Sequence, residues 1–331
     1  MTPRERMLAA CAGARVDHVP ASFWGHHYEA EQSFEGLAEH TIRFQRAGGW
    51  DFIKINPRAQ YHVEDWGVRY RYPDPPGTKC VRTDFPVRGP KDLASLRRLN
   101  PERAEVLSGH LGVVERVARE FPDVPVLMTV FNPLSVLKYA SESEHAVVAA
   151  ARTHPDLVRA ALGAVRDTFR DFAAAAVRRG AAGIFYATTA FASHDLWTPE
   201  DYATWSREDD MAVLGAVADA SLNILHVCRA RSFVERFADY PVQGWSWAST
   251  EPGNAALGST AWLRGAALGG ISQEAALQED SPEAALGEFS SALQATGGRG
   301  FVLAPGCSIP PETPLANLRA LREVSRRTRL A

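Results

Sequence analysis

Short apolar runs alternate with longer stretches of helical periodicity along the whole chain. The eight runs cover residues 19–24, 51–57, 124–131, 183–188, 223–228, 242–247, 267–271 and 301–306. Strands that alternate with helices are typical of a parallel sheet with crossover helices. Eight such units predict an α/β fold of the (β/α)8 TIM barrel type. Because these barrels commonly fill about 250 residues or more, we expect residues 1–331 to form a single domain.

The longest interruption of this alternation lies between the second and third runs, at residues 58–122. Residues 66–72 alternate between apolar and polar with a period of two, and residues 80–85 can pair with them. This pattern predicts a hairpin insertion after the second strand. Long insertions on barrels often become lids or subunit contacts, so this one is a candidate homodimer surface.

Composition and charge limit the classes of molecule that the protein is expected to bind. Hydrophobic residues make up 46% and charged residues 23%, and the formal net charge is −3. This balance provides no basic footprint for nucleic acid or an anionic membrane. The first seven residues are charged and lead into a helix rather than an apolar signal core, so we expect a cytoplasmic protein. The four cysteines, Cys11, Cys80, Cys228 and Cys307, are too few and too scattered for a disulfide framework.

Two of these cysteines end apolar runs. His226 and Cys228 are two positions apart, so on a strand their side chains leave the same face. Cys307 follows the last run, where the carboxyl end of a barrel strand places functional groups. One imidazole and two thiolates form a three-ligand zinc site with an open fourth position, as in catalytic zinc sites. By itself, a His-x-Cys strand is equally compatible with an ordinary core.

The surrounding residues resemble a known family. The segment FVLAPGCSIPPETPLANLRAL, which begins at Phe301, resembles the C-terminal signature of the uroporphyrinogen decarboxylase superfamily. The chain is similar to the branch of zinc-dependent methylcobalamin:coenzyme M methyltransferases, which carry His-x-Cys and a distant Pro-Gly-Cys. The opening residues 2–10 and 15–20 resemble the start of the superfamily as well. The resemblance implies zinc, a small-molecule thiol acceptor, and methylcobalamin or a corrinoid protein as the methyl donor.

One segment departs from the founding enzymes of that superfamily. True uroporphyrinogen decarboxylases carry an arginine-rich segment after the first strand, whereas this chain reads FWGHHY at residues 23–28. Without those cations a porphyrinogen with eight carboxylates loses its charge-assisted contacts. We therefore expect that this chain is not a true uroporphyrinogen decarboxylase.

The donor set itself favours thiol activation. Two thiolates cancel the charge of Zn²⁺, so a substrate thiol that adds a third sulfur stays deprotonated and electron-rich. Nucleobase deaminases need His-x-Glu together with Cys-x-x-Cys, and zinc alcohol dehydrogenases need a Gly-x-Gly-x-x-Gly loop. The sequence has no Cys-x-x-Cys and no such loop. We therefore predict a zinc-dependent methyl or alkyl transferase whose acceptor is a zinc-bound thiolate.

Further site residues are expected at the ends of strands, where barrels place functional groups. Tyr186 is the additional catalytic candidate, and Glu251 is a candidate fourth zinc ligand. The predicted substrate-binding residues are His26, His27, Trp24, Asn132, Trp245 and Trp247. Together with Phe23 and Tyr186, the three tryptophans are expected to form an apolar cup over the metal.

Two alternatives remain open from the residues. The first is a lyase or decarboxylase of a small carboxylic acid on the same barrel, with a carboxylate or tyrosine as the proton donor. The second is a non-catalytic binder of a tetrapyrrole, a corrinoid or a partner protein, with zinc as a structural clip. Metal content separates the binder from the enzymes, and demethylation of methylcobalamin separates the transferase from the lyase.

Overall fold

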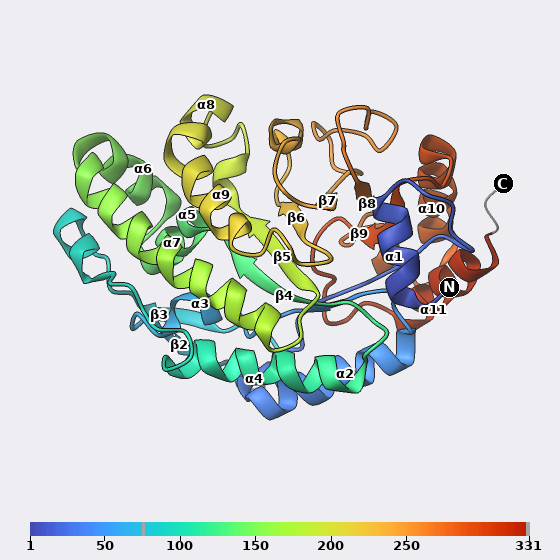
Figure 1. Cartoon of the computed structure of the whole chain (residues 1–331), viewed down its shortest axis with the longest axis horizontal. Coiled ribbons are helices and arrows are strands. Elements are labelled where there is room, and N and C mark those ends of the chain that lie inside the picture. Colours follow the sequence, from blue (N-terminus) through green and yellow to red (C-terminus); the bar gives the residue numbers. More distant parts are fainter. Residues whose placement is uncertain (75–76, 329–331) are drawn as a thin grey trace.

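The fold is an α/β arrangement around a curled parallel sheet. The computed structural model describes residues 1–74 and 77–328. Seven strands pair in the order β1-β4-β5-β6-β7-β8-β9 (Figure 1). They are β1 (Ile53–Ile55), β4 (Val126–Phe131), β5 (Gly183–Thr188), β6 (Ile224–Val227), β7 (Gly244–Trp247), β8 (Ala266–Ile271) and β9 (Phe301–Pro305). Each overlaps one of the apolar runs, so the predicted α/β fold with a parallel sheet is confirmed.

The first predicted run, residues 19–24, makes single bridges instead of a regular strand. Ala21 pairs with Leu303 of β9. The Leu303 amide donates to the Pro20 carbonyl at 2.9 Å, and the Asp51 amide donates to the Ala21 carbonyl at 2.9 Å. Proline has no N–H to donate, and the Ala21 amide bonds to the Asp51 carboxylate at 2.8 Å, so a regular ladder cannot form here. The segment nevertheless connects β9 to the residues before β1.

Helices cover the outside and one end of the sheet. They are α1 (Pro3–Cys11), α2 (Phe34–Gly48), α3 (Tyr61–Glu64), α4 (Glu105–Glu120), α5 (Pro133–Ala140), α6 (Glu144–Thr153), α7 (Pro155–Arg178), α8 (Pro199–Tyr202), α9 (Glu208–Gly215), α10 (Glu283–Thr296) and α11 (Leu315–Arg327). Helices α2 and α4 lie side by side (Figure 1). No helix within the described residues combines the length and apolar character needed to cross a membrane.

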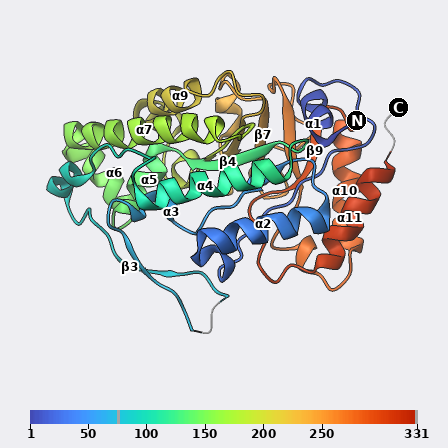
Figure 2. The same ribbon diagram turned by 60° about the horizontal axis from the view of Figure 1, so that its bottom comes forward.

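A small second sheet lies apart from the main one. Strands β2 (Arg69–Arg71) and β3 (Val81–Asp84) pair antiparallel with an irregular register. The segment that carries them projects from the body of the molecule (Figure 2). Arg82 on β3 donates to the carbonyls of Tyr139 and Glu142, so hydrogen bonds connect this sheet to the end of α5.

The curled sheet separates two buried layers. Inside it, Trp24, Phe185, Ile224, Leu268 and Val302 pack together, and side chains from α1 join this inner cluster from one end. Outside it, the alternate residues of the same strands pack against the helices. All six residues of β5 are therefore buried, although neighbouring residues face opposite sides. The inner layer is the floor on which the site is built.

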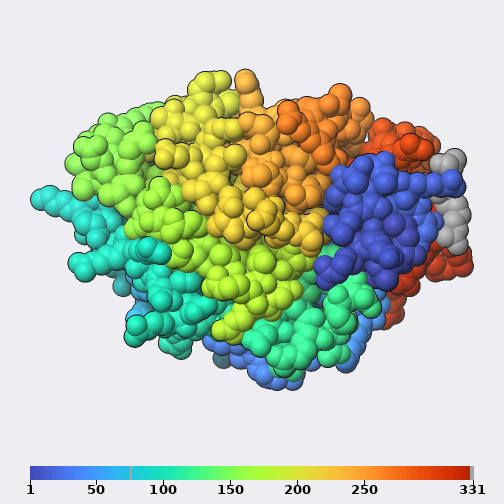
Figure 3. Space-filling view, in the orientation of Figure 1, coloured from blue at the N-terminus to red at the C-terminus, as the bar shows by residue number. Residues whose placement is uncertain are grey.

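An ionic cluster connects the two ends of the chain to the sheet. Asp51 accepts hydrogen bonds from Arg6 on α1 at 2.5 Å and from Arg322 on α11 at 2.7 Å. The Asp51 side chain is 0% exposed, and both arginine side chains are 6% exposed. The N-terminal segment and the C-terminal segment accordingly lie next to each other on the surface (Figure 3).

Candidate metal centre

The end of β6 and the turn after β9 bring three soft ligands together. His226 is on β6, and Cys228 follows that strand directly. Because side chains alternate along a strand, both leave it toward the interior. Cys307 comes two residues after the end of β9. The structure therefore assembles three residues that come from two distant parts of the sequence.

Gly306 allows the chain to turn where Cys307 must enter. A Cβ atom at this position would lie 2.8 Å from the Cα of Ala248 and 2.8 Å from Oε1 of Gln273. Any larger residue would push the backbone away from the loop after β7. The glycine of the Pro-Gly-Cys sequence thus has a steric role in positioning the thiol.

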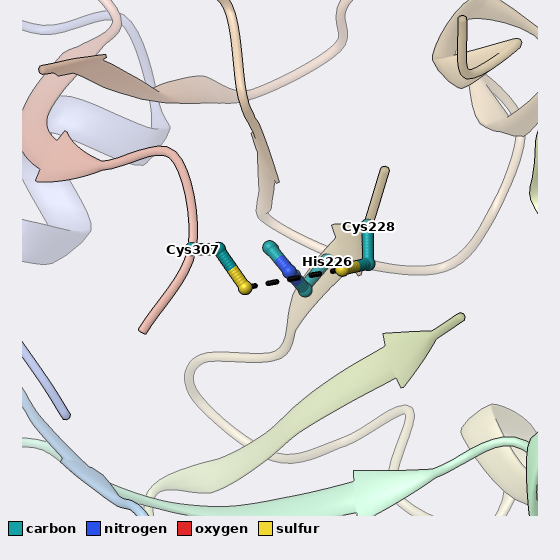
Figure 4. A group of neighbouring side chains, drawn as sticks. All are labelled: His226, Cys228 and Cys307. Carbon is teal, nitrogen blue, oxygen red and sulfur yellow. Dashed lines mark hydrogen bonds between the residues drawn. The ribbon is translucent and has the colours of Figure 1, made fainter. Parts of the chain in front are cut away.

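The donor atoms are close enough to hold one metal ion. The Nδ1 or Nε2 atom of His226 and the two sulfurs all lie within 4.8 Å of one another. The two Sγ atoms are 3.8 Å apart and point toward each other beside the imidazole ring (Figure 4). Two thiolates bound to a tetrahedral zinc at ~2.3 Å have sulfurs about 3.8 Å apart, so the observed spacing fits that ion. Nδ1 of His226 lies 3.1 Å from Ser246 Oγ, an arrangement in which Nε2 is the ligand atom.

The two thiols share their proton unequally. The sulfur–sulfur hydrogen bond lowers the pKa of Cys307 well below its ordinary value, and His226 lowers it further. The same hydrogen bond, together with burial, raises the pKa of Cys228. The pair therefore favours the thiolate on Cys307 over that on Cys228, and a bound cation would favour loss of the second proton.

A cavity of about 230 Å³ opens over these ligands. Its wall contains Trp24, His26, Phe185, Ala187 and Ser308, together with residues from the loop after β1. The cavity is large enough for a small substrate and is lined mainly by apolar groups with a few polar ones, as small-molecule sites usually are.

Lys54 is the buried cation of this cavity. It extends inward from β1, and its Nζ donates to Asn56 Oδ1 and lies 5.0 Å from the centre of the Phe185 ring. Burial lowers the pKa of Lys54 to about 7, although the negative charge of Cys307 acts in the opposite direction. The lysine therefore exchanges its proton near neutrality, beside the site where sulfur carries negative charge.

Only some of the predicted site residues line the metal cavity. Trp24 and His26 line the metal cavity. His27 lines an adjoining cavity, where its ring centre is 4.2 Å from that of His40. Within the described part of the chain, the group of ligands close enough to hold a metal contains His226, Cys228 and Cys307 but not Glu251.

Tyr186 and Asn132 face away from the cavity. Both bond to Asp210 on α9, at 2.8 Å from the tyrosine hydroxyl and 3.3 Å from the asparagine amide. Asn132 also accepts from the Ser135 amide and so caps α5. Since neighbouring strand residues point to opposite faces, Phe185 and Ala187 face inward and Tyr186 outward. The structure therefore places Tyr186 and Asn132 away from any substrate in the cavity, contrary to the expectation from the sequence.

Trp245 and Trp247 also lie outside the sheet. Their indole N–H groups donate to the carbonyls of Phe237 and Ala255, and both side chains pack in the outer core. Ser246 between them faces inward and contacts His226. The expected aromatic cup is therefore replaced by a smaller one, in which Trp24 and Phe185 line the cavity.

Several residues of the cavity wall were not predicted as part of the site. Ser308 follows Cys307 directly, and its hydroxyl donates to Asn56 Oδ1 at 3.3 Å. His62 on α3 is buried in the wall, and neither ring nitrogen has a hydrogen-bond partner among the described residues. Lys54 stands in the sequence as a lone cation within an apolar strand, which is a signal for the site. His62 lies in the long insertion, where the sequence provides no comparable signal.

Buried His110 holds the loop after β1, and its titration predicts a pH effect on stability. Its Nδ1–H donates to the Val106 carbonyl at 2.7 Å, while Nε2 accepts from the Arg58 amide at 3.3 Å. Burial lowers its pKa from 6.5 to about 3. The neutral ring is thus favoured by folding, so its stabilisation is complete above about pH 6.5 and decreases as the pH falls toward 3.

We expect the difference in free energy of unfolding between the wild type and His110→Gln to shrink by about 1 kcal/mol per pH unit between pH 6 and 4. Urea unfolding at several pH values measures this difference. Gln294→Ala, at an exposed position without a titratable group, is the control, and its difference from the wild type should not change with pH. A pH-independent difference for His110→Gln would contradict the assignment.

Comparisons with known proteins agree with this architecture. The model of the family described as "Uroporphyrinogen decarboxylase (URO-D)" matches residues 2–328. A protein of Methanosarcina barkeri, "Methylcobamide:CoM methyltransferase MtaA", is 30% identical over 346 aligned positions, which cover 97% of this chain and 96% of the relative. Its counterpart from the Fusaro strain is also 30% identical, with the same coverage.

Solved structures share the fold. A "methyltransferase from Methanosarcina mazei" superposes with a TM-score of 0.81 at 22% identity, covering 99% of this chain and 98% of that one. A B12-independent methionine synthase from Shewanella superposes with a TM-score of 0.58 at 9% identity, covering 95% of this chain and 98% of that one. At these identities the likeness concerns the fold alone. This chain is similar to methylcobamide:CoM methyltransferases, and the match over residues 2–328 shows that it belongs to the uroporphyrinogen decarboxylase family.

Proposed function

We propose that this protein is a zinc-dependent methyltransferase that transfers a methyl group from a corrinoid to a small thiol. The observation that carries the proposal is the cluster of His226, Cys228 and Cys307, whose donor atoms lie within 4.8 Å at the floor of a cavity. The similarity to MtaA supports the reaction class. We further propose that residues 1–331 form one barrel domain, which residues 20–25 close between β9 and β1.

Each residue of the site has a separate role. His226, Cys228 and Cys307 would hold zinc, which would keep a substrate sulfur deprotonated at neutral pH while leaving it nucleophilic. Ser246 orients the His226 ring from behind. Lys54, when protonated, stabilises negative charge on the sulfurs of the site. Trp24 and Phe185 limit the access of water to the cavity, which strengthens these electrostatic effects.

The methyl transfer needs no external oxidant or reductant. The lone pair of the substrate sulfur forms the new carbon–sulfur bond. The cobalt–carbon bond of the donor breaks, and its electron pair stays on cobalt. The thiol proton leaves to solvent before the transfer. The products are a methyl thioether and the demethylated corrinoid.

A panel of thiols with free methylcobalamin tests this function. We expect the zinc-loaded protein to convert the spectrum of methylcobalamin to that of the demethylated form only when a thiol is added. Calorimetry in buffers of different ionisation enthalpy should detect about one proton released per thiol bound, because the free thiol has a pKa near 8.5. Thiol binding without proton release, combined with CO2 release from small carboxylic acids, would favour the lyase alternative instead.

A further inference from the structure

A second cavity, which we call the α2 cavity, adjoins the metal centre. It measures about 360 Å³ and lies between α2, the sheet and the segment that leads into α11. Its apolar wall includes Phe23, Leu37, Phe44, Trp50, Ile53 and Leu318. The wall it shares with the metal cavity consists of Trp24, His26, Lys54 and Asn56. The two cavities are therefore neighbours with a common boundary.

Three buried side chains of this wall keep polar atoms without partners. Within residues 1–74 and 77–328, no hydrogen bond reaches Gln45 Oε1, Trp50 Nε1 or Asn56 Nδ2. These residues are 5%, 3% and 8% exposed, so water from the bulk does not compensate for the missing partners. Gln45 is fixed in place, because its Nε2 donates to the Trp50 carbonyl at 2.9 Å. A native protein rarely leaves such groups unsatisfied, and a bound ligand would supply the donor and the acceptors that they lack once small side-chain shifts expose them.

Apart from Lys54, which lies at the boundary with the metal centre, the charges around the α2 cavity are paired. The buried Glu31 carboxylate contacts His26 Nδ1 at 2.8 Å and accepts from the Ala59 amide at 3.0 Å. Arg43 is exposed at the rim and pairs with Glu39 at 3.7 Å. A charged ligand group that lies in the cavity beyond Lys54 would lose its hydration without finding a counter-ion in the inner wall. The cavity thus favours an uncharged and mainly apolar occupant.

The boundary between the cavities lies next to the metal ligands. Ser308, which follows Cys307, donates to Asn56 Oδ1, and Lys54 donates to the same oxygen. Asn56 therefore has its oxygen on the side of the metal centre and retains an unused amide donor. A ligand that extends from the metal centre into the α2 cavity would have to cross this shared wall, which contains Asn56.

We infer that the α2 cavity binds the body of the acceptor, and that this acceptor is a thiol with an uncharged, apolar body that carries a neutral hydrogen-bonding group such as an amide. The inference rests on the proposed function for the role of the sulfur. The cavity itself is tested separately with a molecule that has no thiol.

N-benzylacetamide, which has an apolar ring and an amide, is that probe. We expect it to bind equally to the zinc-loaded wild type and to Cys307→Ala, as measured by calorimetry. Thr41→Phe places a ring in the α2 cavity and should weaken this binding by about tenfold or more, because the ligand loses most of its apolar contact. Ala47→Phe, at an exposed part of the wall, is a second variant if Thr41→Phe fails to fold. Ala160→Phe, exposed on α7, is the matched control and should bind like the wild type.

The binding of two thiols is the second part of the test. Phenylmethanethiol should bind the zinc-loaded wild type about tenfold more tightly than 2-mercaptoethanol, and Thr41→Phe should remove this preference. If N-benzylacetamide fails to bind, or binds Thr41→Phe as tightly as the wild type, the inference is overturned. If it binds as expected but neither thiol releases a proton, the α2 cavity is supported as a ligand site and the proposed function fails.

Discussion

Cys307→Ala is expected to leave the protein folded but without bound transition metal and without thiol methylation. The substitution removes one of three ligands and leaves His226 and Cys228, which together are too few to retain zinc at micromolar concentrations. Elemental analysis should fall from about one zinc per chain to a trace. Demethylation of methylcobalamin in the presence of thiol should fall to the uncatalysed rate, because the sulfur is no longer held as a thiolate.

A matched cysteine provides the control for this prediction. Cys80 is buried outside the ligand group, so Cys80→Ala should retain the metal and the activity. Circular dichroism should give the same helix content for both variants. A Cys307→Ala protein that keeps its zinc, or that turns over like the wild type, would contradict the assigned ligands.

Asp51→Ala is expected to cause the largest loss of stability of any substitution proposed here, about 3–5 kcal/mol in the free energy of unfolding. Asp51 is fully buried and is shared by Arg6, Arg322 and the Ala21 amide. Removing it leaves two buried guanidinium groups without their common partner. It also frees the segment that connects β9 to β1, so the N-terminal and C-terminal helices should open first in hydrogen exchange.

An exposed ion pair on α11 is the control for Asp51→Ala. Glu323 and Arg327 pair with side chains that are 60% and 76% exposed, and such pairs contribute little to stability. Glu323→Ala should therefore unfold at the same urea concentration as the wild type. If Asp51→Ala also unfolds at the urea concentration of the wild type, the buried cluster does not hold the two ends of the chain.

The architecture was predictable to the extent that burial leaves a pattern in the sequence. Seven apolar runs overlap the seven strands of the main sheet, because a strand covered on both faces is apolar throughout. The run at 19–24 looks the same, yet Pro20 and the Asp51 carboxylate take the place of ladder hydrogen bonds. Such a side-chain contact comes from a distant residue and cannot be inferred from the run itself.

The site was predictable where spacing alone determines geometry. Two residues separated by one position share a face, so His226 and Cys228 could be paired without knowing which face that is. The same uniform burial explains the errors at Tyr186, Trp245 and Trp247. In β5 and β7 every residue is buried, so the sequence does not distinguish the interior of the sheet from the side that packs on helices. The expected homodimer and cytoplasmic location stay predictions.

X-ray absorption at the zinc edge, with and without a thiol, tests whether His226, Cys228 and Cys307 hold a zinc ion that binds the substrate sulfur. We expect one nitrogen at ~2.1 Å and two sulfurs at ~2.3 Å, with a third sulfur added when the thiol binds. Addition of that sulfur would place the substrate at the open position between His226, Cys228 and Cys307. A zinc shell that keeps two sulfurs at saturating thiol, or that contains none, would show that the substrate sulfur does not bind zinc at these ligands.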